Sequence, residues 1–302
     1  MRLGVDLGGT KIEAILMDRD GNIVERKRIA TPRGDYGQTV LAIRDLIDDV
    51  SRDAPRSLPV GIGIPGTVSP ATDLIKNANS TWLIGKPFDK DLEAAMKRPV
   101  RLANDADCFA LSEAADGAGA GHTSVFGVIL GTGVGGGVVI NGKTVSGPNA
   151  IAGEWGHNAL PWPESTEFPG PKCYCGKTGC IETWLSGPSL EQQARSKNLS
   201  GLSALEIAKA AQSGREDARA LIELYTDRLA RSLAGVINIL DPNVIVLGGG
   251  LSAIGELYTL VPEKWGAHVF SDTVVTELVP NAHGDSSGVR GAAWLWPDTE
   301  AH

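Results

Sequence analysis

The chain has 302 residues, of which 42 % are hydrophobic and 21 % are charged, and its formal net charge is −8. This composition is typical of a globular protein with two domains, and an acidic chain without a basic stripe is a poor candidate for binding nucleic acid. The sequence has no run of about eighteen apolar residues and no signal-peptide pattern, so we expect no membrane-spanning helix and a cytoplasmic location.

The first thirty residues predict short strands joined by tight turns. An apolar strand over Leu3–Leu7 leads into the turn Gly8-Gly9-Thr10-Lys11. Strands over Ile12–Met17 and Ile23–Arg28 follow, joined by the turn signal Asp20-Gly21-Asn22. The first turn offers amides, a hydroxyl and a cation, and the carboxylate of Asp6 just before it could hold a magnesium-bound water.

Residues 123–145 repeat this layout. Strands over Ser124–Leu130 and Gly135–Ile140 enclose the turn Gly131-Thr132-Gly133, and Asn141-Gly142 is a second hairpin signal. A single turn of this kind is as readily an ordinary hairpin, but the duplication favours a function. Two equivalent halves facing each other across a cleft would present both turns to one polyphosphate.

Other elements follow from apolar periodicity and turn residues. We expect helices over Tyr36–Arg52, Leu221–Leu240 and Gly288–Trp296, the last ending at Pro297, and strands over Val60–Ile64 and Val244–Leu247. Segments 131–136 and 137–144 match the dinucleotide-binding and P-loop formulas letter by letter. Both matches are interpreted as accidental, because Val138-Val139-Ile140 predicts a strand where those motifs require a loop or a helix.

Asn104 and Asp105 follow a predicted strand end and precede a helical run. An aspartate in this position can accept a proton from a sugar hydroxyl, and an asparagine can both donate to and accept from hydroxyl groups. The spacing alone favours the alternative that the two residues cap the helix.

One imidazole and three thiols have the spacing of a metal site. His157, Cys173, Cys175 and Cys180 read H-x15-C-x-C-x4-C, which supplies the four ligands of a closed tetrahedral zinc site. Buried thiols or disulfides are the alternative, but the clustering favours a metal in a reducing compartment. Cys108 stands alone and is expected in the core. Glu154 and Glu182 flank the cluster, so a metal that fixes the loop would also orient these carboxylates.

Several motifs, taken in order, resemble the ROK family of bacterial sugar kinases. These motifs are D-L-G-G-T-K, G-I-P-G, N-D-A-x-C, G-T-G-x-G-G-G, G-E-W-G-H, C-x-C-G-x-x-G-C-I-E and V-I-V-L-G-G-G. The resemblance implies an α/β, actin/hexokinase-like (ribonuclease H-like) fold with two domains around a cleft. It also implies ATP and Mg²⁺ as cofactors, a structural Zn²⁺ and a homodimer. The expected domains are residues 1–117 and 118–287, with a final helix at about 288–302 packing back on the first domain.

The family's roles transfer to residues of this chain. Asp105 resembles the catalytic base, and the sugar ligands correspond to Asn104, Glu154, His157 and Glu182, with His157 also binding zinc through its second nitrogen. The phosphate loops correspond to Gly8, Gly9, Thr10 and Lys11 and to Gly131, Thr132 and Gly133. The adenosine contact corresponds to Gly248, Gly249 and Gly250. The sequence departs from the family pattern at none of these positions.

Within the family, the stretches Lys76–Leu83, Pro87–Leu92 and His283–Gly291 are similar to those of proteobacterial fructokinases. We therefore expect ATP-dependent phosphorylation of fructose at its 6-hydroxyl, with mannose or glucose as further acceptors. Asn79 and the bulky Trp82 are expected at the sugar end of the cleft, although Trp82 could instead be a core residue.

Alternative functions remain open on the sequence. N-acetylglucosamine or N-acetylmannosamine kinase is the alternative within the kinases, and a non-catalytic sugar sensor is the alternative outside them. Related repressors carry an additional DNA-binding domain before the first glycine-rich turn, for which the position of Asp6 leaves no room.

Overall fold

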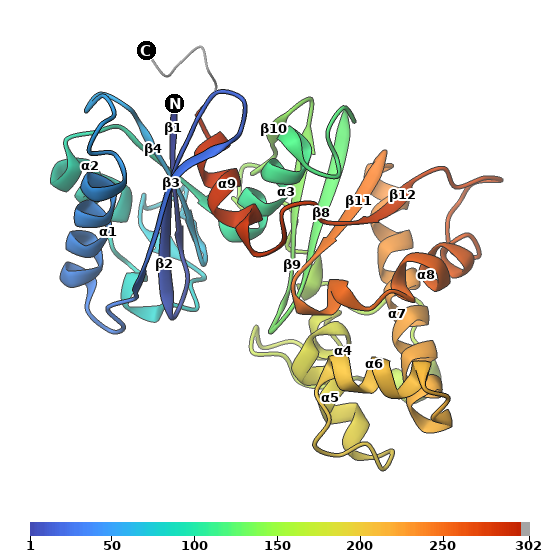
Figure 1. Cartoon of the computed structure of the whole chain (residues 1–302). Helices are drawn as coiled ribbons and strands as arrows, with labels where there is room; N and C mark the ends of the chain where they lie inside the picture. The colour runs from blue at the N-terminus through green and yellow to red at the C-terminus, as the bar shows by residue number, and fades with distance from the viewer. Residues whose placement is uncertain (297–302) are drawn as a thin grey trace. The chain divides into compact units, whose positions relative to one another are not determined.

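The computed structural model describes residues 1–296, and in it the chain folds into two α/β units (Figure 1). The first unit contains Met1–Gly121, Gly137–Ala152 and the described residues from Ala282 onward, and the second contains His122–Gly136 and Gly153–Asn281. The chain therefore passes between the units four times, at 121/122, 136/137, 152/153 and 281/282. The predicted boundary at 117/118 stays a prediction.

The first unit is built on a five-stranded sheet with the order β3-β2-β1-β4-β7. The strands β1, β2 and β3 are antiparallel neighbours, whereas β4 and β7 continue the sheet in parallel with β1. A two-stranded ladder, β5 with β6, lies outside this sheet. The strand bounds are β1 Arg2–Leu7, β2 Lys11–Met17, β3 Ile23–Ala30, β4 Val60–Ile64, β5 Thr67–Val68, β6 Ile75–Lys76 and β7 Val100–Asn104.

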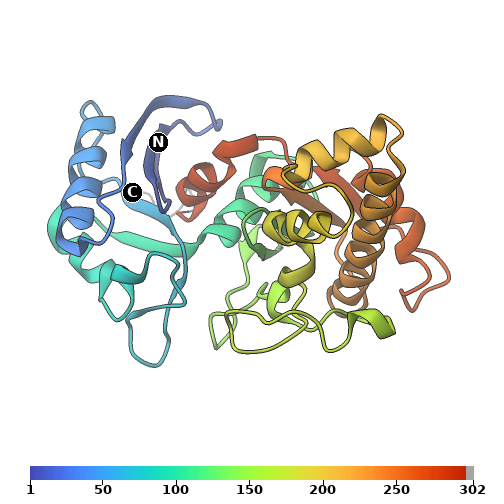
Figure 2. The ribbon, with the colours of Figure 1, turned by 90° about the horizontal axis from the view of Figure 1, so that it is seen from below.

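Helices cover both faces of this sheet (Figures 1 and 2). On one face α1 (Tyr36–Val50) and α2 (Phe88–Met96) bury the main apolar cluster with alternate residues of the strands, such as Val5 and Ile62. On the other face α9 (Ser287–Trp294) lies against β1, β2 and β4 and packs on α3 (Asp105–Asp116). The helix α9 approaches closely because Gly4 and Gly61 carry no side chain, and a Cβ built on Gly61 would lie 1.8 Å from the carbonyl oxygen of Ala292.

A second five-stranded sheet has the order β10-β9-β8-β11-β12, which repeats the pattern of antiparallel and then parallel neighbours. This arrangement confirms the predicted repeat of strand, glycine turn and strand. The bounds are β8 Ser124–Leu130, β9 Val134–Ile140, β10 Lys143–Thr144, β11 Val244–Gly248 and β12 Glu277–Pro280. The helices of the second unit are α4 Glu182–Leu185, α5 Gly187–Arg195, α6 Ala204–Gln212, α7 Glu216–Leu240 and α8 Leu257–Trp265.

Short 3₁₀ turns complete the fold: η1 Thr81–Leu83, η2 Trp155–His157, η3 Ser165–Glu167, η4 Gly250–Ala253 and η5 Gly284–Ser286. Within residues 1–296, no helix combines the length and the apolar character needed to cross a membrane.

The predicted elements differ from the observed ones at their ends. The first helix ends at Val50 rather than Arg52, because the backbone of the C-cap Ser51, with φ −108° and ψ 23°, is no longer helical. The last helix begins at Ser287 and ends at Trp294. The predicted stop at Pro297, and the part of the predicted final helix beyond Trp296, lie outside the described residues.

The contact of α9 with α3 predicts a strong effect of one methyl group. A Cβ on Gly291 would lie 1.6 Å from the carbonyl oxygen of Cys108, and a backbone atom cannot move aside cheaply. We expect Gly291→Ala to lower the free energy of unfolding by about 1–3 kcal/mol or more, measured by urea denaturation.

The matched control is Gly235→Ala within α7, where the nearest atom to an added Cβ, on Pro161, is 3.8 Å away. This variant should be neutral or more stable by about 0.5–1 kcal/mol, because alanine favours a helix interior. Equal stability of the two variants would contradict the packing described for α9.

Candidate functional site

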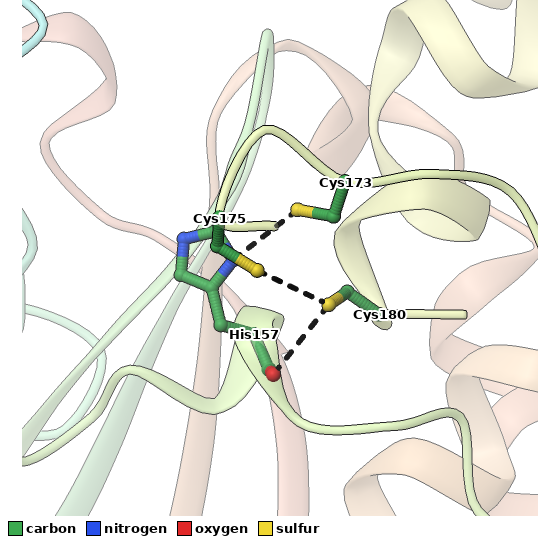
Figure 3. A group of neighbouring side chains, drawn as sticks. All are labelled: His157, Cys173, Cys175 and Cys180. Atoms are coloured by element: carbon green, nitrogen blue, oxygen red, sulfur yellow. Dashed lines mark hydrogen bonds between the residues drawn. The ribbon is translucent and has the colours of Figure 1, made fainter. Parts of the chain in front are cut away.

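Four soft ligands converge in the second unit (Figure 3). The ligand atoms of His157, Cys173, Cys175 and Cys180 all lie within 4.8 Å of one another. The Cys173 Sγ is 3.6 Å from the His157 Nδ1, and the Cys175 Sγ is 3.6 Å from the Cys180 Sγ. A tetrahedral zinc ion with ordinary bond lengths requires ligand separations of about 3.4–3.8 Å. The donor set and its spacing therefore fit Zn²⁺, and all these cysteines are free thiols.

The cysteine loop owes its shape to local backbone hydrogen bonds. The N–H of Cys173 donates to the carbonyl of Lys177 at 2.8 Å, and that of Gly176 donates to the carbonyl of Cys173 at 3.1 Å. Gly176 and Gly179 have φ angles of +91° and +71°, which glycine adopts without strain. The two glycines thus let a short segment present its sulfur atoms to one point, as the sequence predicted.

The thiols differ in their readiness to ionise. Donation from the backbone N–H of Lys177 lowers the pKa of Cys175, whereas burial, followed by hydrogen bonds with Cys175 and Cys173, raises the pKa of Cys180 to about 12. Because zinc binds thiolates, metal binding must release protons from this cluster.

The second nitrogen of His157 faces away from the sulfur atoms. Its Nε2 lies 2.9 Å from the hydroxyl of Tyr174, and the two rings meet edge to face. With a metal on Nδ1, Nε2 would carry the proton and donate it to this hydroxyl or to a sugar hydroxyl. Sequence reasoning missed Tyr174, although its place between two metal-ligand cysteines was a usable signal.

Glu182 connects the segment of the candidate metal ligands, residues 173–180, to the second glycine turn. Its carboxylate accepts the N–H of Val134 at 2.9 Å, and a Cβ on Gly133 would lie 2.6 Å from the same oxygen. The carbonyl of Gly131 in turn accepts the N–H of Gly187 at 2.8 Å. Glu182 is therefore already engaged by the protein through one oxygen. Glu154 is exposed and directly precedes η2, the turn that carries His157.

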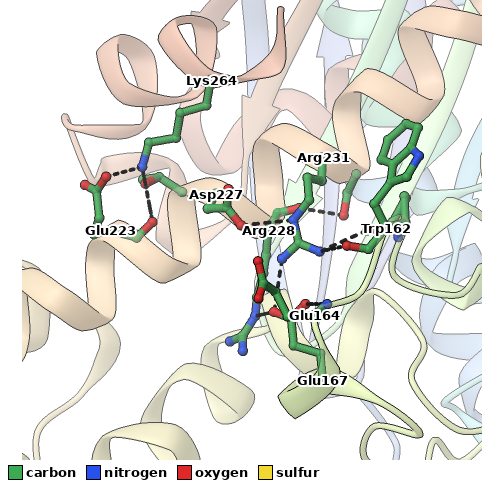
Figure 4. Close-up of polar contacts among 11 residues, drawn as sticks. Trp162, Glu164, Glu167, Glu223, Asp227, Arg228, Arg231 and Lys264 are labelled. Carbon is green, nitrogen blue, oxygen red and sulfur yellow. Dashed lines mark hydrogen bonds and ion pairs between the residues drawn. The ribbon is translucent and has the colours of Figure 1, made fainter. Parts of the chain in front are cut away.

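A buried ion cluster supports the loop between His157 and Cys173 (Figure 4). Glu167 is 3 % exposed and pairs with Arg228 at 2.6 Å and Arg231 at 3.0 Å, both on α7. Arg231 also donates to the carbonyls of Pro161 and Trp162. Burial acts to raise the pKa of Glu167, but hydrogen bonds from Arg231 and Arg228 hold it below its ordinary value. The sequence did not predict this buried ion cluster, because charged residues on a helix usually indicate a face exposed to solvent.

In the first unit, Asn104 and Asp105 lie at the junction of β7 and α3. Asn104 is the N-cap of α3, where its side-chain oxygen accepts the N–H of Ala106 at 2.9 Å and its amide donates to the carbonyl of Gly66 at 3.2 Å. The capping interpretation is thus confirmed for Asn104. Asp105 is the first residue of α3 and is exposed, and one of its oxygens also accepts the Ala106 N–H at 2.9 Å.

Asp6 lies near Asp105 at the end of β1. Burial, followed by the charges of Asp105 and Glu13, raises the pKa of Asp6 to about 7. A carboxylate pushed toward protonation by other carboxylates gains from a nearby cation, so the electrostatics suit the predicted Mg²⁺ role.

The two glycine turns are both accessible to solvent. The N–H of Gly8 donates to the carbonyl of Lys11 at 3.0 Å, and the N–H of Gly131 donates to the carbonyl of Gly133 at 3.0 Å. Gly9, Thr10, Lys11 and Thr132 are exposed. Gly248 ends β11, and Gly249 and Gly250 are exposed, with Gly249 at φ +80°. Their assignment to phosphate and adenosine stays a prediction.

The expected sugar-facing position of Trp82 is wrong. Its side chain packs against the apolar core of the first unit, and its Nε1 donates to the hydroxyl of Thr39 at 3.2 Å. The alternative of a core residue therefore holds, and Trp82 no longer favours fructose. Asn79, three residues earlier, is exposed.

Both the sequence and the fold of this chain are similar to those of known proteins. Residues 2–299 match the sequence profile described as the ROK family. The chain belongs to the ROK family. It is 40 % identical over 299 residues to the N-acetyl-D-glucosamine kinase of Pectobacterium carotovorum subsp. carotovorum, with 98 % of each chain covered. The name of this relative supports the amino-sugar kinase alternative rather than the expected similarity to fructokinases.

Solved structures of ROK proteins share the fold. A ROK hexokinase from Thermus thermophilus aligns with a TM-score of 0.84 and 30 % identity, covering 97 % of this chain and 96 % of the other. A ROK glucokinase from Streptomyces griseus, in complex with glucose and AMPPNP, aligns with a TM-score of 0.76 and 28 % identity, covering 97 % and 98 %. The predicted hexokinase-like α/β fold with two domains is confirmed.

If the four candidate ligands hold zinc, replacing one of them should change both the metal content and the stability of the protein. Cys175→Ser removes one of four ligands, and we expect the purified variant to hold less zinc than the wild type and to unfold at a lower temperature. Atomic emission spectroscopy and thermal unfolding would measure both. Cys108→Ala, which changes a buried thiol outside the cluster, should keep one zinc per chain. Wild-type protein without zinc would refute the site.

Proposed function

We propose that the chain is an ATP-dependent hexose kinase that phosphorylates the 6-hydroxyl of its sugar, with Asp105 as the general base. The observation that carries the proposal is the exposed carboxylate of Asp105 at the start of α3, the helix whose N-terminus Asn104 caps. In this reaction the Asp105 carboxylate takes the proton of the sugar hydroxyl while the hydroxyl oxygen attacks the γ-phosphorus of ATP and ADP departs.

The remaining residues bind and orient. Asn79, Asn104, Glu154, His157 and Glu182 would bind sugar hydroxyls. The amides of Gly8–Lys11 and Gly131–Gly133 would hold phosphates, while Gly248–Gly250 would contact adenosine. Mg²⁺ on the phosphates would supply charge neutralisation, and Asp6 is the carboxylate whose raised pKa suits a neighbouring cation. Zinc would be structural, because four protein ligands leave no open position for a phosphate or water.

We propose N-acetyl-D-glucosamine as the preferred acceptor. The relative with this name supports it across 98 % of the chain. A second support is a cavity of about 250 Å³ in the first unit. It is lined by apolar residues such as Ile64, Val68 and Leu102 and by the hydroxyl-bearing Thr67 and Ser146. An acetamido group requires an open, partly apolar space with polar partners of this kind.

Fructose remains the second candidate acceptor. The stretches Lys76–Leu83, Pro87–Leu92 and His283–Gly291 favour it through their similarity to fructokinases. Hexoses differ by single groups, and their discrimination depends on side-chain placement at a finer scale than identity over the whole chain.

The acceptor assignment is tested by comparing kcat/KM for four sugars with ATP: N-acetylglucosamine, fructose, mannose and glucose. We expect the ratio of N-acetylglucosamine to fructose to exceed one. A ratio below one would favour the fructokinase assignment, and no turnover with any of the four sugars would contradict the hexose kinase proposal itself.

Replacement of the proposed base separates chemistry from binding. Asp105→Asn keeps the size of the side chain but removes the proton acceptor, so turnover should fall by ~10²–10⁴-fold while calorimetry still detects sugar binding. Asp45→Asn on the exposed side of α1 is the control and should keep wild-type turnover. Near-normal turnover of the Asp105 variant would exclude this residue as the base.

A further inference from the structure

Glu113 is a fully buried carboxylate in the last turn of α3. One oxygen, Oε2, accepts the N–H of Ala118 at 3.0 Å and the N–H of Ala282 at 2.9 Å. The other, Oε1, accepts the hydroxyl of Ser287 at 2.8 Å and the N–H of His283 at 3.4 Å. These four donors are backbone or hydroxyl groups, and none is a cation.

The location of Glu113 is unfavourable for a residue that only stabilises its helix. Burying a charge is costly even when hydrogen bonds satisfy it, and a carboxylate at a helix C-terminus opposes the helix dipole. Asp116, at the same end of α3, pairs with His283 at 2.9 Å and with Arg290. Two acidic residues therefore bind the segment that begins at Ala282 from the less favourable end of a helix.

The groups bound by Glu113 lie where the chain passes between the two units. Ala118 stands just before the passage at 121/122, and Ala282 is the first residue after the passage at 281/282. The change of unit at 281/282 is abrupt, since the N–H of Asn281, the residue before Ala282, donates to the carbonyl of Leu247 in the second unit. A single carboxylate oxygen thus binds both the segment that leaves the first unit and the segment that returns to it.

The same helix also contacts a third passage. Gly137 is the first residue after the passage at 136/137, and a Cβ built on it would lie 2.4 Å from the carbonyl oxygen of Ala106 in α3. The first residue of α3 is Asp105. The helix that begins with the proposed base therefore contacts the chain beside three of the four boundaries, of which the one at 136/137 lies inside β9.

We infer that Glu113 is a positioning residue for phosphoryl transfer. By holding the segments at Ala118 and Ala282, it ties the places where the chain leaves the first unit and returns to it to the helix that begins with Asp105. It thereby couples the placement of the proposed base to the connecting segments. This inference rests on the proposed kinase function. If Glu113 served stability alone, its replacement would lower the unfolding temperature and leave the chemistry of the folded protein intact.

The test is Glu113→Gln in the full chain. The amide has the size of the carboxylate, but its NH₂ group cannot accept a hydrogen bond, so at least one side of the arrangement is lost. We expect kcat/KM for the sugar to fall by up to ~10²-fold, the loss that small misplacements of reacting groups produce. We also expect more ATP hydrolysed per sugar phosphate formed, and a smaller change in X-ray scattering on addition of sugar.

Ser287→Ala is the matched control. It removes one donor to Glu113 from α9 but leaves the bonds to Ala118 and Ala282. This variant should lose stability while keeping the wild-type ratio of ATP hydrolysed to sugar phosphorylated and the wild-type scattering change.

The outcomes separate the inference from the function on which it rests. A wild-type protein that phosphorylates no hexose contradicts the proposed function. An active wild type whose Glu113→Gln variant keeps the coupling ratio and the scattering change overturns the inference, whatever its unfolding temperature. If the glutamine variant does not fold, Glu113→Asp, which keeps the charge but shortens its reach, is judged by the same two measurements.

Discussion

The hydrogen bond from the Val134 N–H to the carboxylate of Glu182 joins the segment of the candidate metal ligands to the second glycine turn, both in the second unit. Glu182 follows the last candidate metal-ligand cysteine, Cys180, by two residues, and its partner Val134 directly follows the turn Gly131–Gly133. A metal that fixes Cys180 therefore also fixes a proposed sugar ligand and a proposed phosphate turn. The requirement for glycine at position 133 has the same origin, because any side chain there would occupy the position of the Glu182 carboxylate.

In the first unit, the helix α3 contributes both to the proposed active site and to the binding of the connecting segments. Its N-terminal end presents Asp105 and is capped by Asn104, while its C-terminal end binds the connecting segments through Glu113. The close contact of Gly291 with Cys108 holds this helix against α9. Proposed chemistry and chain connectivity thus depend on a single twelve-residue helix, Asp105–Asp116.

Features encoded by adjacent residues could be predicted from the sequence. The glycine turns after β1 and β8, the cap at Asn104 and the convergence of Cys173, Cys175 and Cys180 depend on local turns and spacing, and the structure contains all of them. The family motifs predicted the fold, because they extend over nearly the whole chain.

Features that depend on partners distant in the sequence could not be predicted. Glu167 meets Arg231 across 64 residues, and Glu113 meets Ala282 across 169, and no local pattern distinguishes these acids from surface charges. Trp82 was misassigned for the same reason, since its partner Thr39 lies 43 residues earlier. The sugar is hardest to predict, because acceptors that differ by one substituent leave no distinct motif.

We propose that the candidate metal ligands and the sugar ligands Glu154, His157 and Glu182 form one mechanically coupled part of the second unit. Isothermal titration of the sugar that the protein phosphorylates best, into zinc-loaded protein and into the same protein stripped by a chelator, tests it most directly. If zinc orients Glu154, His157 and Glu182, sugar affinity should fall by about tenfold or more without the metal and return when zinc is restored. Equal sugar affinity of folded protein with and without zinc would contradict the account.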